Sequence, residues 1–258
     1  MLKYRTLWVS DIHLGTRGCQ AELLLDFLGN VHAETMYLVG DIFDGWVLKK
    51  RWYWPQAHNN VIHHFLRVAR AGGKVVYIPG NHDEMARDYV NTSFGGVQVL
   101  MNTMHTTADG KRLLIIHGDE FDAVMGYAKW LAKLGSVAYG FALGLNMVFN
   151  WGRRFFGFPY WSLSAYLKAK VKDAVKHVND FEHFLAEEAR SAKADGIVCG
   201  HIHRAEMRMI EGILYCNDGD WVESCTAMVE HFDGRLEIIN WPLQRAALLG
   251  QNTPTTSA

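Results

Sequence analysis

Cysteine is scarce in this chain, and no two cysteines stand close together in the sequence. The four are Cys19, Cys199, Cys216 and Cys225, and they form neither a C-x-x-C pair nor a tight framework. This spacing argues against a structural zinc site built on thiols and against a disulfide-stabilised secreted scaffold. We therefore expect reduced, mostly buried thiols, as in a cytoplasmic protein.

An excess of positive charge is also missing. The formal net charge is −1 and the sequence pI is about 6.9, so the chain lacks the basic footprint of a duplex nucleic-acid-binding protein, and no nucleic-acid partner is expected. The chain begins with Lys3-Tyr4-Arg5 and a predicted strand, so we expect no signal peptide. A content of 49% apolar and 21% charged residues suits a folded core in one large α/β domain, with or without an insertion.

What the chain does contain is one pattern that recurs along its length. Short apolar runs predict buried strands, and several of them end directly in Asp, Asn or His. In open α/β sheets the carboxyl edge of the strands is where ligands bind. The predicted strands occupy residues 5–9, 36–39, 74–78, 97–101, 196–199, 213–216, 226–232 and 236–241, with a hairpin over 105–116, and the predicted helices 21–31, 56–71, 121–151 and 161–192.

The side chains that follow five of these strands are of the kinds that bind metals. Histidine nitrogen, carboxylate oxygen and asparagine carbonyl form a mixed N/O set that favours Mn, Fe or Zn over Ca. Seven ligands are too many for one ion and suit two, about 3.5–4 Å apart, with one shared carboxylate. The seven candidates are Asp11, His13, Asp41, Asn81, His117, His201 and His203.

Asp41 is central in this series and is the expected bridge between the two ions. A hydroxide held by both metals would attack phosphorus, and the metals would neutralise charge on the phosphoryl oxygens. His82 is not among the seven candidate ligands and is expected to donate a proton to the departing oxygen, with Asp44 holding its ring in orientation. Any one of these motifs alone is ordinary turn chemistry, and only their ordered recurrence points to a metal site.

The segment between His117 and His201 is predicted to be helical. It carries no charge from Leu134 to Gly152, which is long enough to raise the question of a transmembrane helix. Three interpretations stay open: a membrane span, a buried helix of an inserted cap, and a cap helix with an apolar face open to lipid. Interspersed glycines lower its hydrophobicity and argue against the first.

The strand-end motifs as an ordered set resemble those of the calcineurin-like metallophosphoesterase superfamily, over residues 5 to 241 apart from the insertion. The resemblance implies an α/β fold, a four-layer αββα sandwich of two mixed sheets with an inserted helical cap. We expect the core at 1–122 and 193–245, the cap at 123–192 and a polar tail at 246–258. The motifs are Asp11-x-His13, Gly40-Asp41-x-x-Asp44, Gly80-Asn81-His82-Asp83, His117-Gly118-Asp119 and Gly200-His201-x-His203.

The same resemblance implies a division of the ligands between two metals. His82 would be the acid or transition-state stabiliser and Asp44 its partner. The first metal would bind Asp11, His13, Asp41 and His203, and the second Asp41, Asn81, His117 and His201.

Two segments, 10–15 and 39–44, together with the predicted cap, are similar to the UDP-2,3-diacylglucosamine diphosphatases of lipid A synthesis. This similarity implies a manganese enzyme that cuts a pyrophosphate to UMP and a lipid sugar phosphate. It also implies a cytoplasmic location at the inner face of the membrane, with peripheral contact through the cap. The cap's charge-free stretch would cover acyl chains, and its basic side chains are expected to meet phosphate: Arg153, Arg154, Lys168 and Lys172.

One departure leaves the substrate open. Those enzymes typically carry arginine where this chain has His82, whereas Gly-Asn-His-Asp is the general superfamily form. The alternative is therefore a phosphodiesterase or phosphatase of the same superfamily that acts on a soluble nucleotide or another phospholipid. A third alternative, a catalytically inactive scaffold, would show lost ligands, and none is lost here. The sequence determines neither the native metal nor the oligomeric state.

Overall fold

A computed structural model of the chain describes residues 1–121 and 181–250. The chain divides into two compact units, Met1–Asp119 with Leu185–Ala258, and Glu120–Phe184. Most of the predicted cap and four predicted phosphate-binding side chains therefore lie outside the described residues: Arg153, Arg154, Lys168 and Lys172. The description that follows concerns the described residues, most of which belong to the first unit.

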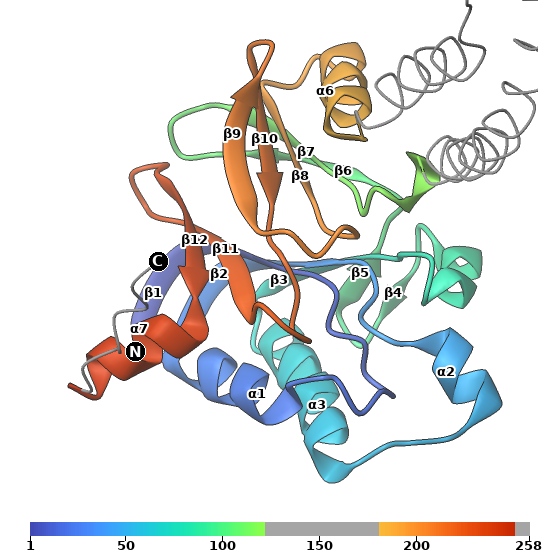
Figure 1. Cartoon of the computed structure of the whole chain (residues 1–258). Helices are drawn as coiled ribbons and strands as arrows, with labels where there is room; N and C mark the ends of the chain where they lie inside the picture. Colours follow the sequence, from blue (N-terminus) through green and yellow to red (C-terminus); the bar gives the residue numbers. More distant parts are fainter. Residues whose placement is uncertain (122–180, 251–258) are drawn as a thin grey trace, which may run out of the picture. The chain divides into compact units, whose positions relative to one another are not determined.

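Seven strands form the larger sheet, in the order β12-β11-β1-β2-β3-β5-β4 (Figure 1). The central strands β1, β2, β3 and β5 run parallel, and β11 pairs with β1 in the antiparallel sense. Their carboxyl ends consequently meet at one edge. The strands are β1 (Leu2–Val9), β2 (Val31–Val39), β3 (Lys74–Ile78), β4 (Ser93–Phe94), β5 (Val97–Val99), β11 (Thr226–Glu230) and β12 (Leu236–Asn240).

Five strands form the second sheet, in the order β6-β7-β8-β10-β9. β7 and β10 both run parallel to β8, while β6 and β9 are antiparallel edge strands. The expectation of two mixed sheets is thus confirmed. The strands are β6 (Thr103–Thr106), β7 (Arg112–Ile115), β8 (Gly196–Cys199), β9 (Glu206–Ile210) and β10 (Ile213–Asn217).

The two sheets pack face to face through a largely apolar layer, which also holds the buried hydrogen bond between His105 of β6 and Glu230 of β11. Trp8, Tyr37 and Ile78 from the larger sheet belong to the same buried cluster as Ile115 and Val198 from the smaller one. The opposite face of the larger sheet is covered by helices whose apolar side chains complete a second cluster. These helices are α1 (Ala21–Asn30) and α3 (Gln56–Arg70).

The remaining elements are short or lie at the margins of the sheets. The 3₁₀ turn η1 follows β3, and η2 follows β7. No helix in the described part of the chain combines the length and the apolar character of a membrane span. The elements are α2 (Gly45–Lys50), η1 (Glu84–Tyr89), η2 (Asp119–Phe121), α6 (Phe181–Ser191) and α7 (Trp241–Leu248).

Several boundaries differ from the sequence-based prediction, and three of them have a visible cause. The first helix ends at Asn30, because Val31 is extended and pairs with Leu2 as the start of β2. The aromatic segment after Asp44 begins as helix α2, because the Asp44 carboxylate accepts a hydrogen bond from Val47 N at 2.8 Å. The last predicted strand stops at Asn240, whose side chain caps α7.

Helix α7 corrects the expected tail, because residues 246–248 are helical. Trp241 Nε1 donates to Asp26 Oδ2 at 2.9 Å, and Arg245 Nε lies 2.7 Å from the same oxygen. Asp26 belongs to α1, so a contact with a distant part of the chain stabilises this helix.

Candidate metal centre

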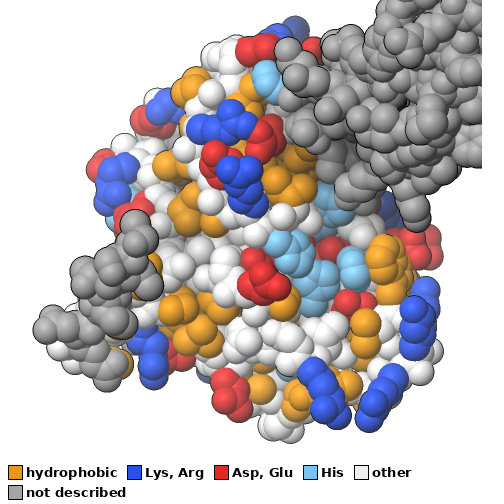
Figure 2. Space-filling view, in the orientation of Figure 1, with side chains coloured by type: hydrophobic (Ala, Val, Ile, Leu, Met, Phe, Trp, Pro, Cys, Tyr) orange, Lys and Arg blue, Asp and Glu red, His pale blue; other side chains and the backbone are white. Residues whose placement is uncertain are grey.

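The polar side chains that follow the strands converge on one face of the molecule. The space-filling view shows histidine side chains gathered there with carboxylates between them (Figure 2). Within each of three overlapping groups, one candidate ligand atom per residue lies within 4.8 Å of the others. Asp41 belongs to two of the groups and His13 to two. The groups are Asp11, His13 and His203; His13, Asp41 and His82; and Asp41, His117 and His201.

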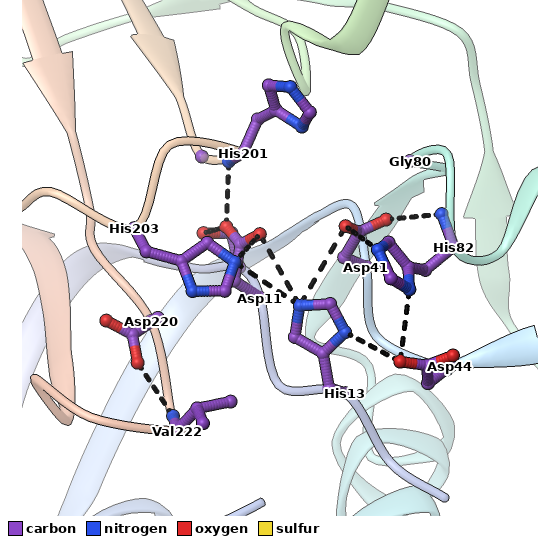
Figure 3. Close-up of polar contacts among 12 residues, drawn as sticks. Asp11, His13, Asp41, Asp44, Gly80, His82, His201, His203, Asp220 and Val222 are labelled. Carbon is purple, nitrogen blue, oxygen red and sulfur yellow. Dashed lines mark hydrogen bonds and ion pairs between the residues drawn. The ribbon is translucent and has the colours of Figure 1, made fainter. Parts of the chain in front are cut away.

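One end of this centre is formed by the loops after β1 and β8 (Figure 3). His203 Nε2 lies 3.1 Å from Asp11 Oδ1, and His13 Nε2 lies 3.9 Å from the same oxygen. The two histidine nitrogens are 3.3 Å apart. Two imidazoles and a carboxylate oxygen therefore point at a common position.

The other end is formed around His117, which is 2% exposed. Its Nδ1 donates to the carbonyl of Val39 at 2.8 Å, so the second ring nitrogen, Nε2, faces the centre, 3.5 Å from Asp41 Oδ1. Orientation of a ligand histidine through its other nitrogen is typical of metal sites. His201 completes this group, and its backbone N–H donates to Asp11 Oδ2 at 2.9 Å.

The electrostatic field of the centre favours positive charge. Burial opposes an imidazolium at His117, but the Asp41 carboxylate 3.5 Å away and the charge of Asp11 outweigh burial and raise its pKa to about 10. Burial likewise opposes ionisation of Asp41, yet the contacts with His117 and the backbone of His82 lower its pKa to about 2. A pocket with such a field attracts cations.

Several buried polar atoms of the centre have no hydrogen-bond partner among the described residues, and this bears on whether the residues fit a metal. Asp11 Oδ1, Asn81 Oδ1 and His117 Nε2 are buried and form no hydrogen bond with the described residues. Leaving such an atom unpaired costs about 1–3 kcal/mol, so native proteins rarely do so without a reason. All three are expected ligands, and coordination to a cation would satisfy them. The residues fit divalent metals.

The backbone around the centre is held in an unusual conformation. Five of the candidate ligands have positive φ, between 49° and 69°, a region that costs non-glycine residues of order 1–3 kcal/mol each. Such strain clusters at functional sites, where the surroundings enforce it. The five are Asp11, His13, Asp41, His201 and His203.

Two glycines let the loops approach one another. A Cβ atom at Gly40 would lie 2.1 Å from His117 Nδ1, and one at Gly200 would lie 2.4 Å from Asp11 Oδ2. Real Cβ atoms do not come so close, so side chains at these positions would displace the candidate ligands. The glycines that precede the ligands in the motifs are therefore a packing requirement.

His82 lies at the rim, with 24% of its side chain exposed. Its Nδ1 is 3.0 Å from Asp44 Oδ2, and its Nε2 is 4.0 Å from Asp41 Oδ2. The ring is flanked by Trp46, with centroids 4.0 Å apart, and by His13 at 4.6 Å. The expected pairing of His82 with Asp44 is present in the geometry. Asp44 also lies 3.4 Å from His13 Nδ1, which the sequence did not suggest.

Asp83, for which the sequence motifs predicted no role, connects two of the loops. This carboxylate is 1% exposed and accepts hydrogen bonds from Gly80 N at 2.5 Å, Ile42 N at 2.8 Å and Phe43 N at 3.3 Å. It therefore fixes the loop after β2 against the loop after β3. The sequence feature that could have revealed this role is the position of Asp83 at the end of the Gly-Asn-His-Asp motif.

A second missed group lies beneath Asp11. Ser10 Oγ contacts both Asp11 Oδ2, at 2.5 Å, and Asp218 Oδ1, at 2.7 Å. Asp218 is fully buried, and burial raises its pKa well above the usual range. Asp218 follows β10 directly in an Asn-Asp-Gly-Asp run, so it repeats the strand-end pattern at a strand whose end the sequence analysis passed over.

Comparisons with known proteins agree with this geometry. The family model described as calcineurin-like phosphoesterase matches residues 4–205. The UDP-2,3-diacylglucosamine hydrolase of Aliivibrio fischeri is 31% identical over 121 residues, which cover 44% of this chain and 47% of that protein. The enzyme of the same description from Neisseria gonorrhoeae is 25% identical over 224 residues, covering 83% and 88%. The first match thus spans about half of that relative's length.

Solved structures of phosphoesterases are also similar to the chain, at low identity. An archaeal phosphodiesterase is 12% identical with a TM-score of 0.43, covering 91% of this chain and 98% of that one. A phosphoesterase from E. coli is 14% identical with a TM-score of 0.40, again over 91% and 98%. Both TM-scores lie below 0.5.

Proposed function

The chain belongs to the calcineurin-like phosphoesterase family, and we propose on that basis that it is a metal-dependent hydrolase of phosphoric esters or anhydrides. The observation that carries the proposal is the convergence of three overlapping Asp/His groups, in which Asp11 Oδ1 and His117 Nε2 are buried without a hydrogen-bond partner among the described residues. Asp41 belongs to two of these groups, which supports its role as the shared carboxylate.

Two divalent cations are proposed to bind at this centre. Manganese is the first choice, with iron or zinc as alternatives, because the ligands combine imidazole nitrogen with carboxylate and amide oxygen. When bound, such a pair activates water and neutralises charge on a phosphoryl group. The proposed ligands are Asp11, His13, Asp41 and His203 for one cation and Asp41, Asn81, His117 and His201 for the other.

His82 is proposed to protonate the leaving oxygen from Nε2. Its Nδ1 lies 3.0 Å from Asp44 Oδ2, and its Nε2 is the ring nitrogen near Asp41 Oδ2, at 4.0 Å. The rings of Trp46 and His13 restrict rotation of the imidazole. A general acid at this position contributes about 10²–10⁴-fold to turnover.

The proposed substrate is a nucleotide-linked lipid similar to UDP-2,3-diacylglucosamine, cleaved at its pyrophosphate to UMP and a lipid sugar phosphate. The relatives with this activity in their names support it, one of them over 83% of the chain. On this proposal the protein works in the cytoplasm at the inner membrane face. The predicted cap would cover the acyl chains, and its cations would contact phosphate: Arg153, Arg154, Lys168 and Lys172.

A soluble nucleotide or a different phosphodiester is the second candidate. His82 favours it, because the lipid A enzymes are expected to carry arginine at this position. The chemistry of the metal centre would be the same, so only the substrate distinguishes the two proposals.

Reconstitution with manganese tests both. Protein stripped by a chelator and reloaded with manganese is incubated with UDP-2,3-diacylglucosamine and, separately, with bis(p-nitrophenyl) phosphate and a dinucleotide. Release of UMP from the lipid at a higher kcat/KM than any soluble ester supports the first substrate. Faster turnover of the soluble esters supports the second, and no hydrolysis of any of them with metal bound would refute the proposed activity.

A further inference from the structure

Helix α2 carries cationic side chains that the proposed reaction does not use, Lys49 and Lys50. Its inner face is anchored beside the metal centre. Gly45 N donates to His82 O at 2.8 Å, and the Leu48 side chain fills the space where a Cβ at Gly15 would lie, 2.6 Å away. Helical spacing places Trp46, Lys49 and Lys50 together on another face, since residues three and four apart are neighbours.

This outer face is apolar and positively charged at once. Trp46 is 43% exposed, Val47 38% and, just beyond the helix, Trp52 73%. Three consecutive cations, Lys49, Lys50 and Arg51, are also exposed. Among the described residues, none of the three cationic side chains has a hydrogen-bond or ion-pair partner. We call these six residues, 46, 47 and 49–52, the α2 surface.

Stacked rings hold the exposed aromatic side chains in place. Trp52 stacks on Trp54 with centroids 5.7 Å apart, and Trp54 stacks on Phe43 at 6.2 Å. Phe43 lies two residues from Asp41, and Trp46 packs on His82. The α2 surface is therefore ordered and continuous with the metal centre, and Figure 2 shows basic and hydrophobic side chains beside the gathered histidines.

We propose that the α2 surface docks the protein on an anionic phospholipid bilayer. Indole rings prefer the headgroup level of a membrane, where their apolar body and polar N–H are both satisfied. Each Lys or Arg near an anionic bilayer adds about 1 kcal/mol of attraction. Unpaired cations that surround exposed indoles complement a surface that is negatively charged outside and apolar beneath.

The shape of the surface favours a bilayer over a small anionic ligand. A ligand site is concave and encloses its ligand. Here Trp52 is nearly three-quarters exposed, and the cations follow one another along the end of a helix, so they point outward over an extended area. Docking through α2 would bring the metal centre to the plane of the headgroups, a consequence that matters for catalysis only if the proposed lipid substrate is correct.

Sedimentation with vesicles tests the docking. The manganese-loaded full chain is mixed with vesicles of phosphatidylglycerol and phosphatidylcholine in equal parts, and with pure phosphatidylcholine vesicles. We expect binding to the anionic vesicles that falls as salt is added, and no binding to the neutral ones. The double variant Lys49→Glu/Lys50→Glu should bind more than tenfold more weakly, because each cation contributes about fivefold. Trp52→Ala should weaken binding at high salt as well.

A matched control separates local contact from net charge. Arg70→Glu/Lys74→Glu changes the net charge by the same amount, from −1 to −5, at exposed positions near the amino end of β3, away from the centre. It should weaken binding no more than twofold. The proposal would be overturned if both double variants lost vesicle binding equally, or if the wild-type protein did not bind anionic vesicles. Retention on heparin without vesicle binding would do the same and would indicate a soluble polyanion as the partner.

The outcome is separable from that of the proposed reaction. The Lys49→Glu/Lys50→Glu variant should hydrolyse bis(p-nitrophenyl) phosphate at the wild-type rate, because neither side chain belongs to the metal centre. Vesicle binding that persists in a protein without any hydrolase activity would leave docking intact and refute the reaction. Hydrolysis of the soluble ester without vesicle binding would leave the proposed reaction intact and refute the docking.

Discussion

Asp44 Oδ2 lies 3.0 Å from Nδ1 of His82 and 3.4 Å from Nδ1 of His13, so one carboxylate contacts two imidazoles at the rim of the centre. The second oxygen of Asp44 accepts the hydrogen bond from Val47 N that begins α2. A single side chain thus connects the proposed acid, a proposed ligand and the helix of the α2 surface.

Replacement of His82 should separate catalysis from metal binding. His82→Ala is expected to lower kcat by about 10²–10⁴-fold, because it removes the general acid. Metal content, measured by mass spectrometry of the dialysed protein, should stay at the wild-type level. Loss of metal in this variant would instead indicate that His82 is a metal ligand. Its position close to His13 and Asp41 would be consistent with that role.

Two substitutions at Asp44 should have different effects on stability. Asp44→Asn keeps an oxygen for the cap of α2 but removes the charge that faces His82, so kcat should fall while the melting temperature changes little. Asp44→Ala also removes the cap, at a cost of about 1 kcal/mol. Thermal unfolding and steady-state kinetics on the two variants measure both effects. Equal kcat in Asp44→Asn and wild type would show that the carboxylate does not orient the acid.

Asp41 should be needed for both metals together. Asp41→Asn is expected to reduce bound manganese from about two ions per chain to below one, because the shared carboxylate is lost. Activity should disappear with the metal. Asp88→Asn, an exposed carboxylate in η1, is the matched control and should change neither quantity. Two ions retained in Asp41→Asn would rule out the bridging role.

Gly40 lies so close to the His117 ring that there is no space for a methyl group on its Cα. Gly40→Ala should disrupt the centre, because the new Cβ would overlap His117. Gly72→Ala is the control, since Gly72 also has positive φ, 92° against 81°, but has open space around it. The control should cost only about 1 kcal/mol of backbone strain. Comparison of metal affinity in the two variants tests the packing argument, and wild-type affinity in Gly40→Ala would contradict it.

A buried carboxylate between the two sheets, that of Glu230, should make stability depend on pH. Burial alone would raise the pKa of Glu230, but hydrogen bonds from His105, Thr6 and Ala108 N lower it from 4.5 to about 2. Because the folded-state pKa lies below the unfolded value, the stabilisation is complete above pH 4.5 and is lost as the pH falls toward 2. It amounts to at most about 3 kcal/mol.

Urea unfolding at several pH values measures this contribution. Glu230→Gln should be destabilised at pH 7, and its free energy of unfolding should fall less steeply than that of wild type between pH 4.5 and 2. Glu223→Gln, at an exposed position, serves as the control. Parallel curves for wild type and Glu230→Gln would contradict the assignment.

The sequence predicted the core elements of the fold wherever a strand is buried on both faces. β3 was expected at 74–78 and β8 at 196–199, and both begin and end at these residues. The edge strand β9 escaped prediction because it is short and only Ile210 is buried, while its alternating Met207 and Met209 are exposed, so pairing with β10 defines it. α7 was missed for a related reason, since Asp26, far away in the sequence, holds it.

The sequence by itself determined which residue types stand at the strand ends, because the spacing of buried strands dictates where the chain leaves the sheet. Only the tertiary structure decided how they meet. Asp83 and Asp218 contribute through hydrogen bonds to partners from other strands, and such partners have no fixed sequence separation. Left-handed φ at Asp11 and Asp41, and the close approach at Gly40, exist only because two sheets bring their loops together.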